Sequence, residues 1–346
     1  MISSTTFLPT CSVVICTRNR PDALDRCLLA LERLVYPRFE VLVVDNAPSD
    51  TRAMDVARRR GARYLVEPVA GLSRARNTGA RACASDVIAF TDDDAVPERT
   101  WLSHLAAQFR DPSVAAVTGR TLMLFDGAAE IPLDASDLGP ATIRLDRSQP
   151  LWFEMASFGG IGNGNNMAVR RRVFDGWSGF DERLGRGAFL PSCEEHRAFA
   201  QLIEDGHAVI YTPEAVVRHP VPTTVNERRE HFLRSRSDLA AYAVFLFCTT
   251  KHRGRVAKYV AQAVLGTKRS WRFHTEVVPA HFVSRWRLVK AYLSGASTCV
   301  RGLMRTTLRP RLSGAIPLVR LTASAKPTAV HRSFTRRWKP DTTSTR

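Results

Sequence analysis

The amino-acid sequence predicts an α/β protein with a mostly parallel sheet, helices on both faces, and a basic helical C-terminal extension. Short apolar runs alternate with helical patterns through the first half, and a polar cluster directly follows several of these runs. Lys and Arg become dense after Pro222. Short apolar strands that alternate with helices are typical of parallel sheets. Ligands of such sheets bind beyond the carboxyl ends of the strands, so the polar clusters mark the candidate site.

Taken in order, the elements follow from the pattern of apolar residues. The expected elements are strand 12–16, helix 21–34, strand 41–44, helix 51–60, strand 63–66, helix 73–84, strand 87–90, a long surface loop over 126–150, renewed order from Trp152, helix 194–205, strand 207–211 and amphipathic helices within 227–303. We therefore expect three parts, which are a sheet domain (8–222), a basic helical region (223–304) and a flexible basic tail (305–346).

Composition limits the classes of protein. The seven cysteines form no CxxC pair, which argues against a disulfide framework or a zinc site and favours a reducing cytosol. The N-terminus has no signal-peptide pattern, and the longest apolar stretch (239–248) is shorter than the roughly 20 residues of a membrane span. The formal net charge of +17 indicates a polyanionic partner or surface.

Three adjacent carboxylates, Asp92, Asp93 and Asp94, end the strand 87–90. Because neighbouring carboxylates repel one another, they need a compensating charge. Mg²⁺ or Mn²⁺ supplies one and typically completes its coordination with phosphate oxygens. The alternative interpretation is a solvated acidic turn before the next helix.

Four motifs in order resemble those of the family-2 inverting glycosyltransferases, nucleotide-diphospho-sugar transferases of the Rossmann-like GT-A fold. The motifs are VVICTRNR (13–20), VVDN (43–46), GLSRARNTG (71–79) and TDDD (91–94). The resemblance continues through His219 and covers about two thirds of the chain.

The resemblance implies a donor site with a metal ion. The residues implied to contact the nucleotide, its phosphates or the sugar are Thr17, Arg20, Asp45, Arg76, Asn77, Asp92 and Asp93. The residues implied to lie nearest Mn²⁺ or Mg²⁺ are Asp93, Asp94 and His219. A carboxylate at Asp45 suits the imide N–H of a base, and an Arg fork at Arg76 suits phosphate.

A segment rich in Gly and Asn (159–171) resembles the part of the family that lies against the donor sugar and the acceptor. Its glycines permit close backbone approach to a ligand, and its amides supply directional donors and acceptors. The residues expected there are Gly162, Asn165, Asn166 and Met167. A plain glycine-rich turn is the alternative.

Inverting transfer needs a carboxylate that deprotonates the acceptor hydroxyl. The family has an acidic pair at the position of residues 193–197, which read CEEHR in this chain. Glu195 stands there in place of the usual Asp. We expect Glu195 to be the base and leave Glu194 open. Ser192 and Glu195 also spell a capping box, which predicts a capped helix start.

The C-terminal third combines basic residues with aromatic ones, which suits an anionic membrane surface, while a solvated helix face and a nucleic-acid site are alternatives. Nucleic acid is the less favoured partner. Arg285-Trp286 resembles part of the QxxRW motif of processive synthases, but Phe282 stands at the Gln position, so single transfer is expected.

These observations predict a cytoplasmic glycosyltransferase, peripheral on the inner face of the cell membrane, and the family resemblance implies a UDP- or dTDP-type sugar donor. Its acceptor is left open among glycans, lipid-linked acceptors and small molecules. A nucleotidyltransferase is disfavoured because the loop 16–20 has no glycine. A non-catalytic membrane- or nucleic-acid-binding protein on the same scaffold is the other alternative, and it would need none of Asp93, Asp94, Glu195 and His219.

Overall fold

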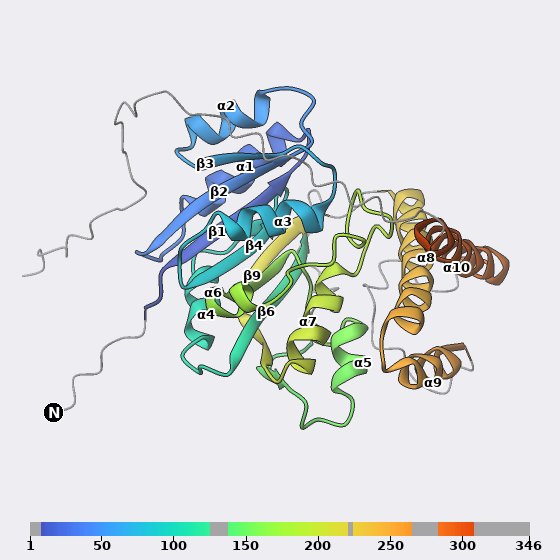
Figure 1. Ribbon diagram of the computed structural model, residues 1–346. Helices are drawn as coiled ribbons and strands as arrows, with labels where there is room; N and C mark the ends of the chain where they lie inside the picture. Colours follow the sequence, from blue (N-terminus) through green and yellow to red (C-terminus); the bar gives the residue numbers. More distant parts are fainter. Residues whose placement is uncertain (1–7, 125–137, 221–223, 265–282, 308–346) are drawn as a thin grey trace, which may run out of the picture.

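The computed structural model describes residues 8–124, 138–220, 224–264 and 283–307. In these ranges a nine-stranded sheet carries helices on both faces, and three further helices stand beside it (Figure 1). The α/β class, the helix-covered sheet and the helical C-terminal region are thereby confirmed.

The strands are β1 (Cys11–Thr17), β2 (Phe39–Asn46), β3 (Arg63–Glu67), β4 (Val87–Asp92), β5 (Val96–Pro97), β6 (Val114–Leu124), β7 (Ile143–Leu145), β8 (Asn166–Arg170) and β9 (Ala208–Pro220). The helices are α1 (Pro21–Leu31), α2 (Arg52–Arg59), α3 (Leu72–Arg81), α4 (Trp101–Gln108), α5 (Trp152–Ser157), α6 (Arg171–Gly176), α7 (Glu194–Glu204), α8 (Val225–Thr249), α9 (Arg253–Val264) and α10 (Arg285–Thr307).

The sheet has the order β3-β2-β1-β4-β8-β6-β9-β5, with β7 on β9. Strands β3, β2, β1 and β4 are parallel, as the sequence predicts. Beyond them β8 runs antiparallel between β4 and β6, and β9 is parallel to β6. The carboxyl ends of β1, β2 and β4 therefore meet at one edge of the sheet.

Each face of the sheet has its own apolar core, because successive side chains of a strand point to opposite faces. Val13 and Ile15 of β1 pack with α1, α2 and α4 on one face. Val14 packs with α3, α5 and α7 on the other face. Strands buried on both sides explain why the predicted runs are continuously apolar.

The C-terminal helices continue the second core and also form a small cluster of their own around Phe232 and Val283. Tyr242 and Phe245 of α8 are buried in the same cluster as the sheet residues. Helix α8 begins at a capping box in which Thr224 and Glu227 exchange hydrogen bonds. Helices α8 and α10 approach so closely that a Cβ on Gly295 would clash with the Ser237 carbonyl. One apolar core therefore extends across the domain boundary predicted at residue 222, because it contains residues from both sides of that boundary.

Three expected boundaries change. The strand expected at 207–211 continues to Pro220, and α10 extends to Thr307, past the expected start of the tail. The loop expected at 126–150 contains β7, because residues 143–145 pair with β9. Residues 125–137, Phe282 and residues 308–346 lie outside the described residues. Among the described helices, none combines the length and apolarity needed to cross a bilayer.

Candidate active site

A cavity of about 660 Å³ opens at the carboxyl ends of β1, β2 and β4. The start of α7 and the N-terminal half of α8 form its other walls. Its lining residues are Cys16, Thr17, Arg18, Arg20, Asn46, Leu72, Arg76, Asp92, Asp93, Asp94, Thr121, Asn163, Gly164, Asn165, Arg186, Gly187, Pro191, Ser192, Glu194, Glu195, His219, Pro220, Arg228, His231, Phe232, Arg234 and Ser235. The cavity lies where ligands of a parallel sheet bind, beyond the strand ends.

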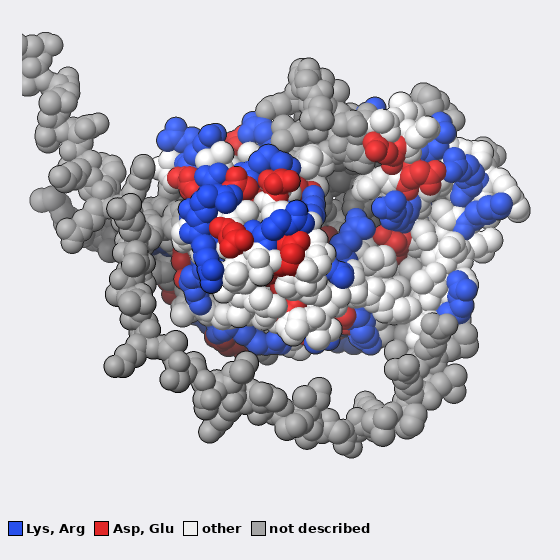
Figure 2. All heavy atoms as spheres, turned by 90° about the horizontal axis from the view of Figure 1, so that it is seen from above, with Lys and Arg blue, Asp and Glu red and all other residues white. Residues whose placement is uncertain are grey.

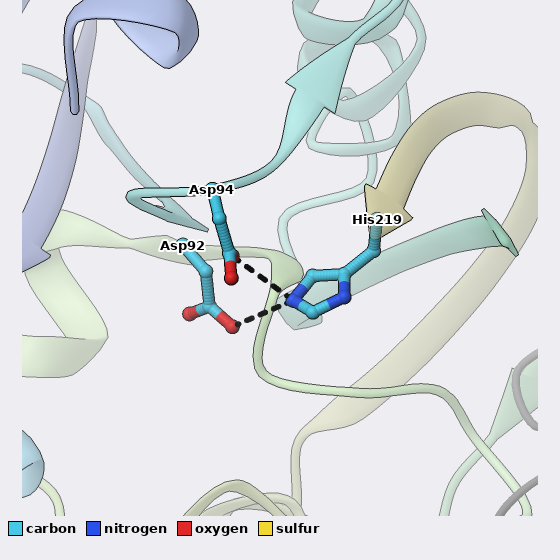
Figure 3. A group of neighbouring side chains, drawn as sticks. All are labelled: Asp92, Asp94 and His219. Atoms are coloured by element: carbon cyan, nitrogen blue, oxygen red, sulfur yellow. Dashed lines mark ion pairs between the residues drawn. The ribbon is translucent and has the colours of Figure 1, made fainter. Parts of the chain in front are cut away.

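Asp92, Asp94 and His219 converge on one point of this cavity (Figure 3). His219 Nε2 lies 3.1 Å from Asp94 Oδ1 and 3.7 Å from Asp92 Oδ2. Ligand atoms of all three residues lie within 4.8 Å of one another. The two aspartates end β4 and His219 ends β9, so the sheet brings together residues from distant parts of the sequence. This group of two oxygens and one nitrogen fits a divalent cation such as Mn²⁺.

Asp93, expected as a metal ligand, lines the same cavity but is not part of this group, so its place at the metal stays a prediction. Its carboxylate accepts hydrogen bonds from Thr17 Oγ1 at 2.7 Å and from Arg20 at 2.8 Å. Arg20 also contacts Asp94 at 2.5 Å. Asp92, which was expected at the ribose or sugar, is the residue that groups with Asp94 and His219. Strand β4 ends at Asp92, and the chain turns through Asp93 and Asp94, with Ala95 N donating to the Asp92 carbonyl at 3.2 Å.

Protein cations compensate the three carboxylates. Burial opposes the charged form of His219, but hydrogen bonds and charge from Asp92 and Asp94 outweigh it and raise its pKa to about 10. Burial favours the neutral form of Asp94, yet His219 and Arg20 hold its pKa below the ordinary value. Burial raises the pKa of Asp93 to about 6, against the effect of Arg20 and Thr17. Metal binding at this site would displace the proton of His219.

Arg76 connects the metal side of the cavity with the start of α7. Its buried guanidinium contacts Glu194 at 2.5 Å, Asp92 at 3.6 Å and the Gly164 carbonyl at 3.2 Å. Glu195 has no such strong ion pair and receives a backbone hydrogen bond from Gly164. Burial raises the pKa of both glutamates. Glu194 is thus held as the partner of Arg76, while the Glu195 carboxylate faces the cavity.

The capping box expected from Ser192 and Glu195 is absent. Helix α7 has Cys193 at its N-cap position, and no side chain caps it. Cys193 adopts a left-handed backbone conformation (φ 69°), which turns the chain sharply before the helix. The Glu195 carboxylate instead accepts hydrogen bonds from its own backbone N–H and from the backbone of Gly164.

Two expected nucleotide contacts lie behind the cavity wall. Asp45 is 1% exposed and accepts a hydrogen bond from Tyr64 at 2.7 Å, while its Oδ1 has no hydrogen-bond partner among the described residues. The Asn77 amide exchanges hydrogen bonds with the backbone of Phe180 at 2.8 and 2.9 Å. Both side chains point into the protein interior, and Asn77 does so because it lies on the buried face of α3. Neither residue lines the cavity.

Of the four residues expected at the sugar and acceptor, Asn165 lines the cavity and the other three are structural. Gly162 has φ +102° and packs so closely on Thr118 that a Cβ would not fit. Met167 is buried in the core of β8. Asn166 accepts from Trp101 Nε1 and donates to the carbonyls of Arg120 and Ala215, each at 2.8 Å. The strand β8 turns these side chains inward.

We expect Asn166→Ala to destabilise the fold instead of impairing ligand binding. The substitution leaves the Trp101 N–H and two buried carbonyls without their partner, and each unsatisfied buried group costs about 1–3 kcal/mol. Chemical denaturation should show a free energy of unfolding lowered by several kcal/mol, against a matched Asn165→Ala variant that stays near wild type. Equal stability of the two variants would contradict this assignment.

The cavity has a fourth wall that the sequence motifs do not indicate. Helix α8 contributes Arg228, His231 and Arg234, and the loop before α7 contributes Arg186. The dense Arg and Lys of this region were visible in the sequence. Their position against the acidic trio depends on the docking of α8, which no local pattern shows.

Comparison with known proteins relates these features to a family. Residues 12–175 match the sequence model of glycosyl transferase family 2. The chain is 29% identical over 219 residues to the pre-mycofactocin glycosyltransferase of Mycobacterium tuberculosis, which covers 62% of this chain and 44% of that protein. It is 28% identical over 192 residues to glycosyltransferase AglE of Haloferax volcanii, covering 53% and 60% respectively. The chain thus spans about half the length of these curated relatives.

A solved structure shares the fold. The mannosyltransferase PcManGT from Pyrobaculum calidifontis, in complex with GDP-Man and Mn²⁺, matches with a TM-score of 0.50 and 20% sequence identity, over 87% of this chain and 80% of that one. The sheet and its helices therefore have the GT-A fold of sugar-transferring enzymes. Residues 12–175 are thus similar to glycosyl transferase family 2.

Proposed function

We propose that this chain is a metal-dependent inverting glycosyltransferase that moves one sugar from a nucleotide diphosphate to an acceptor hydroxyl. The observation that carries the proposal is the single cavity that joins Asp92, Asp94 and His219 to the carboxylate of Glu195. The similarity to family 2 and the GDP-Man bound by the structural neighbour support a nucleotide-sugar donor. The UDP or dTDP type expected from the sequence stays a prediction.

The donor fits the strand-end side of the cavity. Thr17, Arg20 and Asn46 follow β1 and β2 and line the part nearest the sheet, where a nucleotide would lie. Asp92, Asp94 and His219 would hold a divalent cation, Mn²⁺ or Mg²⁺, next to the diphosphate. The ion, when bound, would neutralise the charge that develops on the diphosphate. The Mn²⁺ of the neighbouring structure supports this assignment.

The acceptor fits the α7 side. Glu195 would take the proton of the acceptor hydroxyl as the hydroxyl oxygen forms its bond to the anomeric carbon and the bond to the nucleoside diphosphate breaks. Arg76 would orient the site by holding Glu194 and Asp92 together. Asn165, which accepts a hydrogen bond from Thr121 at 2.9 Å, would contact the sugar or the acceptor.

A peripheral position on an anionic membrane surface also remains a proposal. Along one side of α10, Trp286, Val289, Leu293 and Val300 are 67%, 44%, 65% and 45% exposed. Lys290 lies over the Trp286 ring at 5.7 Å. An exposed apolar stripe beside basic residues is typical of helices that lie on anionic lipid.

A thermal-shift screen tests the proposed enzyme. We expect one nucleoside diphosphate to raise the melting temperature in the presence of Mn²⁺ or Mg²⁺ and to raise it less in EDTA, because a ligand that binds the folded state stabilises it by mass action. The base that gives the largest shift identifies the donor. If no nucleotide shifts the melting of demonstrably folded protein, the binding-protein alternative is favoured.

A further inference from the structure

The wall of the cavity opposite the acidic trio is basic. Arg186 comes from the loop before α7, and Arg228, His231 and Arg234 come from successive turns of α8. Seen from above, Lys and Arg side chains cover both the sheet part and the C-terminal helices (Figure 2), but these four residues belong to the cavity itself. We call them the basic wall.

The basic wall is held in place by packing between the loop and the C-terminal helices. The Arg183 guanidinium lies 4.8 Å from the centre of the Phe245 ring of α8. The Phe189 ring packs against Gly302 of α10, where a Cβ would not fit. The backbone carbonyl of Arg186 accepts a hydrogen bond from Leu72 N at 2.8 Å. The loop is therefore fixed both to α3 and to the C-terminal helices, and Arg186 faces the same space as α8.

Two cations of the basic wall, Arg186 and Arg234, act on the same neighbouring groups, His231 and Asp238. Within the described ranges, Arg186 and Arg234 make no ion pair with a carboxylate. Burial, followed by the positive charges of Arg186, Arg234 and His219, lowers the pKa of His231. Asp238 senses both arginines, but burial dominates and raises its pKa. Like charges gathered on a cavity wall create a positive potential that attracts an anion.

We propose that the basic wall binds a phosphate group carried by the acceptor, which makes the acceptor a phosphorylated molecule. The inference rests on the proposed function. Arg guanidinium groups match phosphate with pairs of hydrogen bonds, and several converging cations suit its double charge.

Position assigns this phosphate to the acceptor instead of the donor. Arg186 follows Gly185, where a Cβ would lie 3.2 Å from the carboxyl carbon of Glu194, so this part of the basic wall adjoins the start of α7. The donor diphosphate has its own place at Asp92, Asp94 and His219, where a divalent cation would balance its charge. The basic wall, on the acceptor side, is then available for a second anion, the phosphate group of the acceptor.

Titration of the full-length chain with inorganic phosphate tests the proposal. The protein is first saturated with Mg²⁺ and the nucleoside diphosphate found in the thermal-shift screen, so that the donor site is filled. We expect the double variant Arg186→Ala/Arg234→Ala to bind phosphate at least tenfold more weakly than wild type. Its affinity for the nucleotide should change less than twofold. The control, Arg253→Ala/Lys258→Ala, removes the same charge from exposed positions of α9 and should bind phosphate like wild type.

Each contrary result has a distinct meaning. An equal loss of nucleotide affinity would overturn the proposal by assigning the basic wall to the donor diphosphate. Unchanged phosphate binding with lost binding to vesicles of anionic lipid would assign it to the membrane surface. If wild type shows no metal-dependent nucleotide binding, the proposed function fails, yet phosphate titration of the nucleotide-free chain still measures the basic wall. A melting curve for each variant establishes that it is folded.

Discussion

The Glu195→Gln variant should lose turnover by about 10²–10⁴-fold, the range typical of a lost general base, while it binds the nucleotide donor as tightly as wild type. The amide preserves size but does not take up a proton at neutral pH. Glu195 lines the cavity on α7, away from the strand ends where the donor would lie, so its charge matters for transfer more than for donor binding. With water as the acceptor, release of nucleoside diphosphate and free sugar gives a rate without knowledge of the natural acceptor, and equilibrium titration gives donor affinity.

Glu194→Gln is the matched comparison, and we expect it to lower the stability of the fold. Glu194 pairs with the buried Arg76 at 2.5 Å, so the substitution leaves a buried guanidinium without its counter-charge. Breaking a buried pair costs about 3–5 kcal/mol, so we expect a lower free energy of unfolding in this variant and not in Glu195→Gln. Near-normal turnover of Glu195→Gln, with a folded but inactive Glu194→Gln, would reverse the two assignments.

The pH profile gives an independent measure of the same base. Burial is the main cause that raises the pKa of Glu195, and Arg76 acts in the opposite direction. A base works in its deprotonated form, so the rate should rise with pH through a pKa above the ordinary value for Glu. This rising limb should be absent from the residual activity of Glu195→Gln. A wild-type limb at the ordinary Glu pKa would argue against a buried base.

Asp94→Asn is expected to abolish metal-dependent nucleotide binding. The neutral amide is a weaker ligand for Mn²⁺ or Mg²⁺, and Asp94 is the carboxylate closest to His219, at 3.1 Å. Loss of outer-shell partners alone costs about 10–100-fold in metal affinity, so loss of a direct ligand should cost more. The increase in melting temperature produced by nucleotide and Mn²⁺ together should disappear.

The control for Asp94→Asn is Asp55→Asn, an exposed carboxylate on α2, which removes the same charge far from the cavity. It should keep the full metal-dependent shift. If Asp94→Asn also keeps the shift, then Asp94 is not a metal ligand, and Arg20 and His219 form a permanent counter-charge to the acidic residues.

Much of the fold follows from local patterns. The strands β1, β2, β3 and β4 and the helices between them were predicted within a few residues. Strands β1, β2 and β4 are buried almost throughout and leave an uninterrupted apolar signal, whereas the edge strand β3 is partly exposed. The central strand β6 and the antiparallel β8 were not predicted. β8 follows a segment of Gly and Asn whose composition is typical of a loop, and only its pairing with β4 and β6 makes it a strand.

The sequence by itself indicated the fold class and where to look for a candidate site, because motifs after successive strands must meet at one edge of a parallel sheet. It also determined that Asp92, Asp93 and Asp94 need a counter-charge. Only the tertiary structure decided which of them faces His219, that Asn166 and Met167 point inward, and that Glu194 is taken by Arg76. It also brought the arginines of α8 to the cavity. The direction of a side chain depends on the packing of distant segments, and a sequence motif carries no information about that packing.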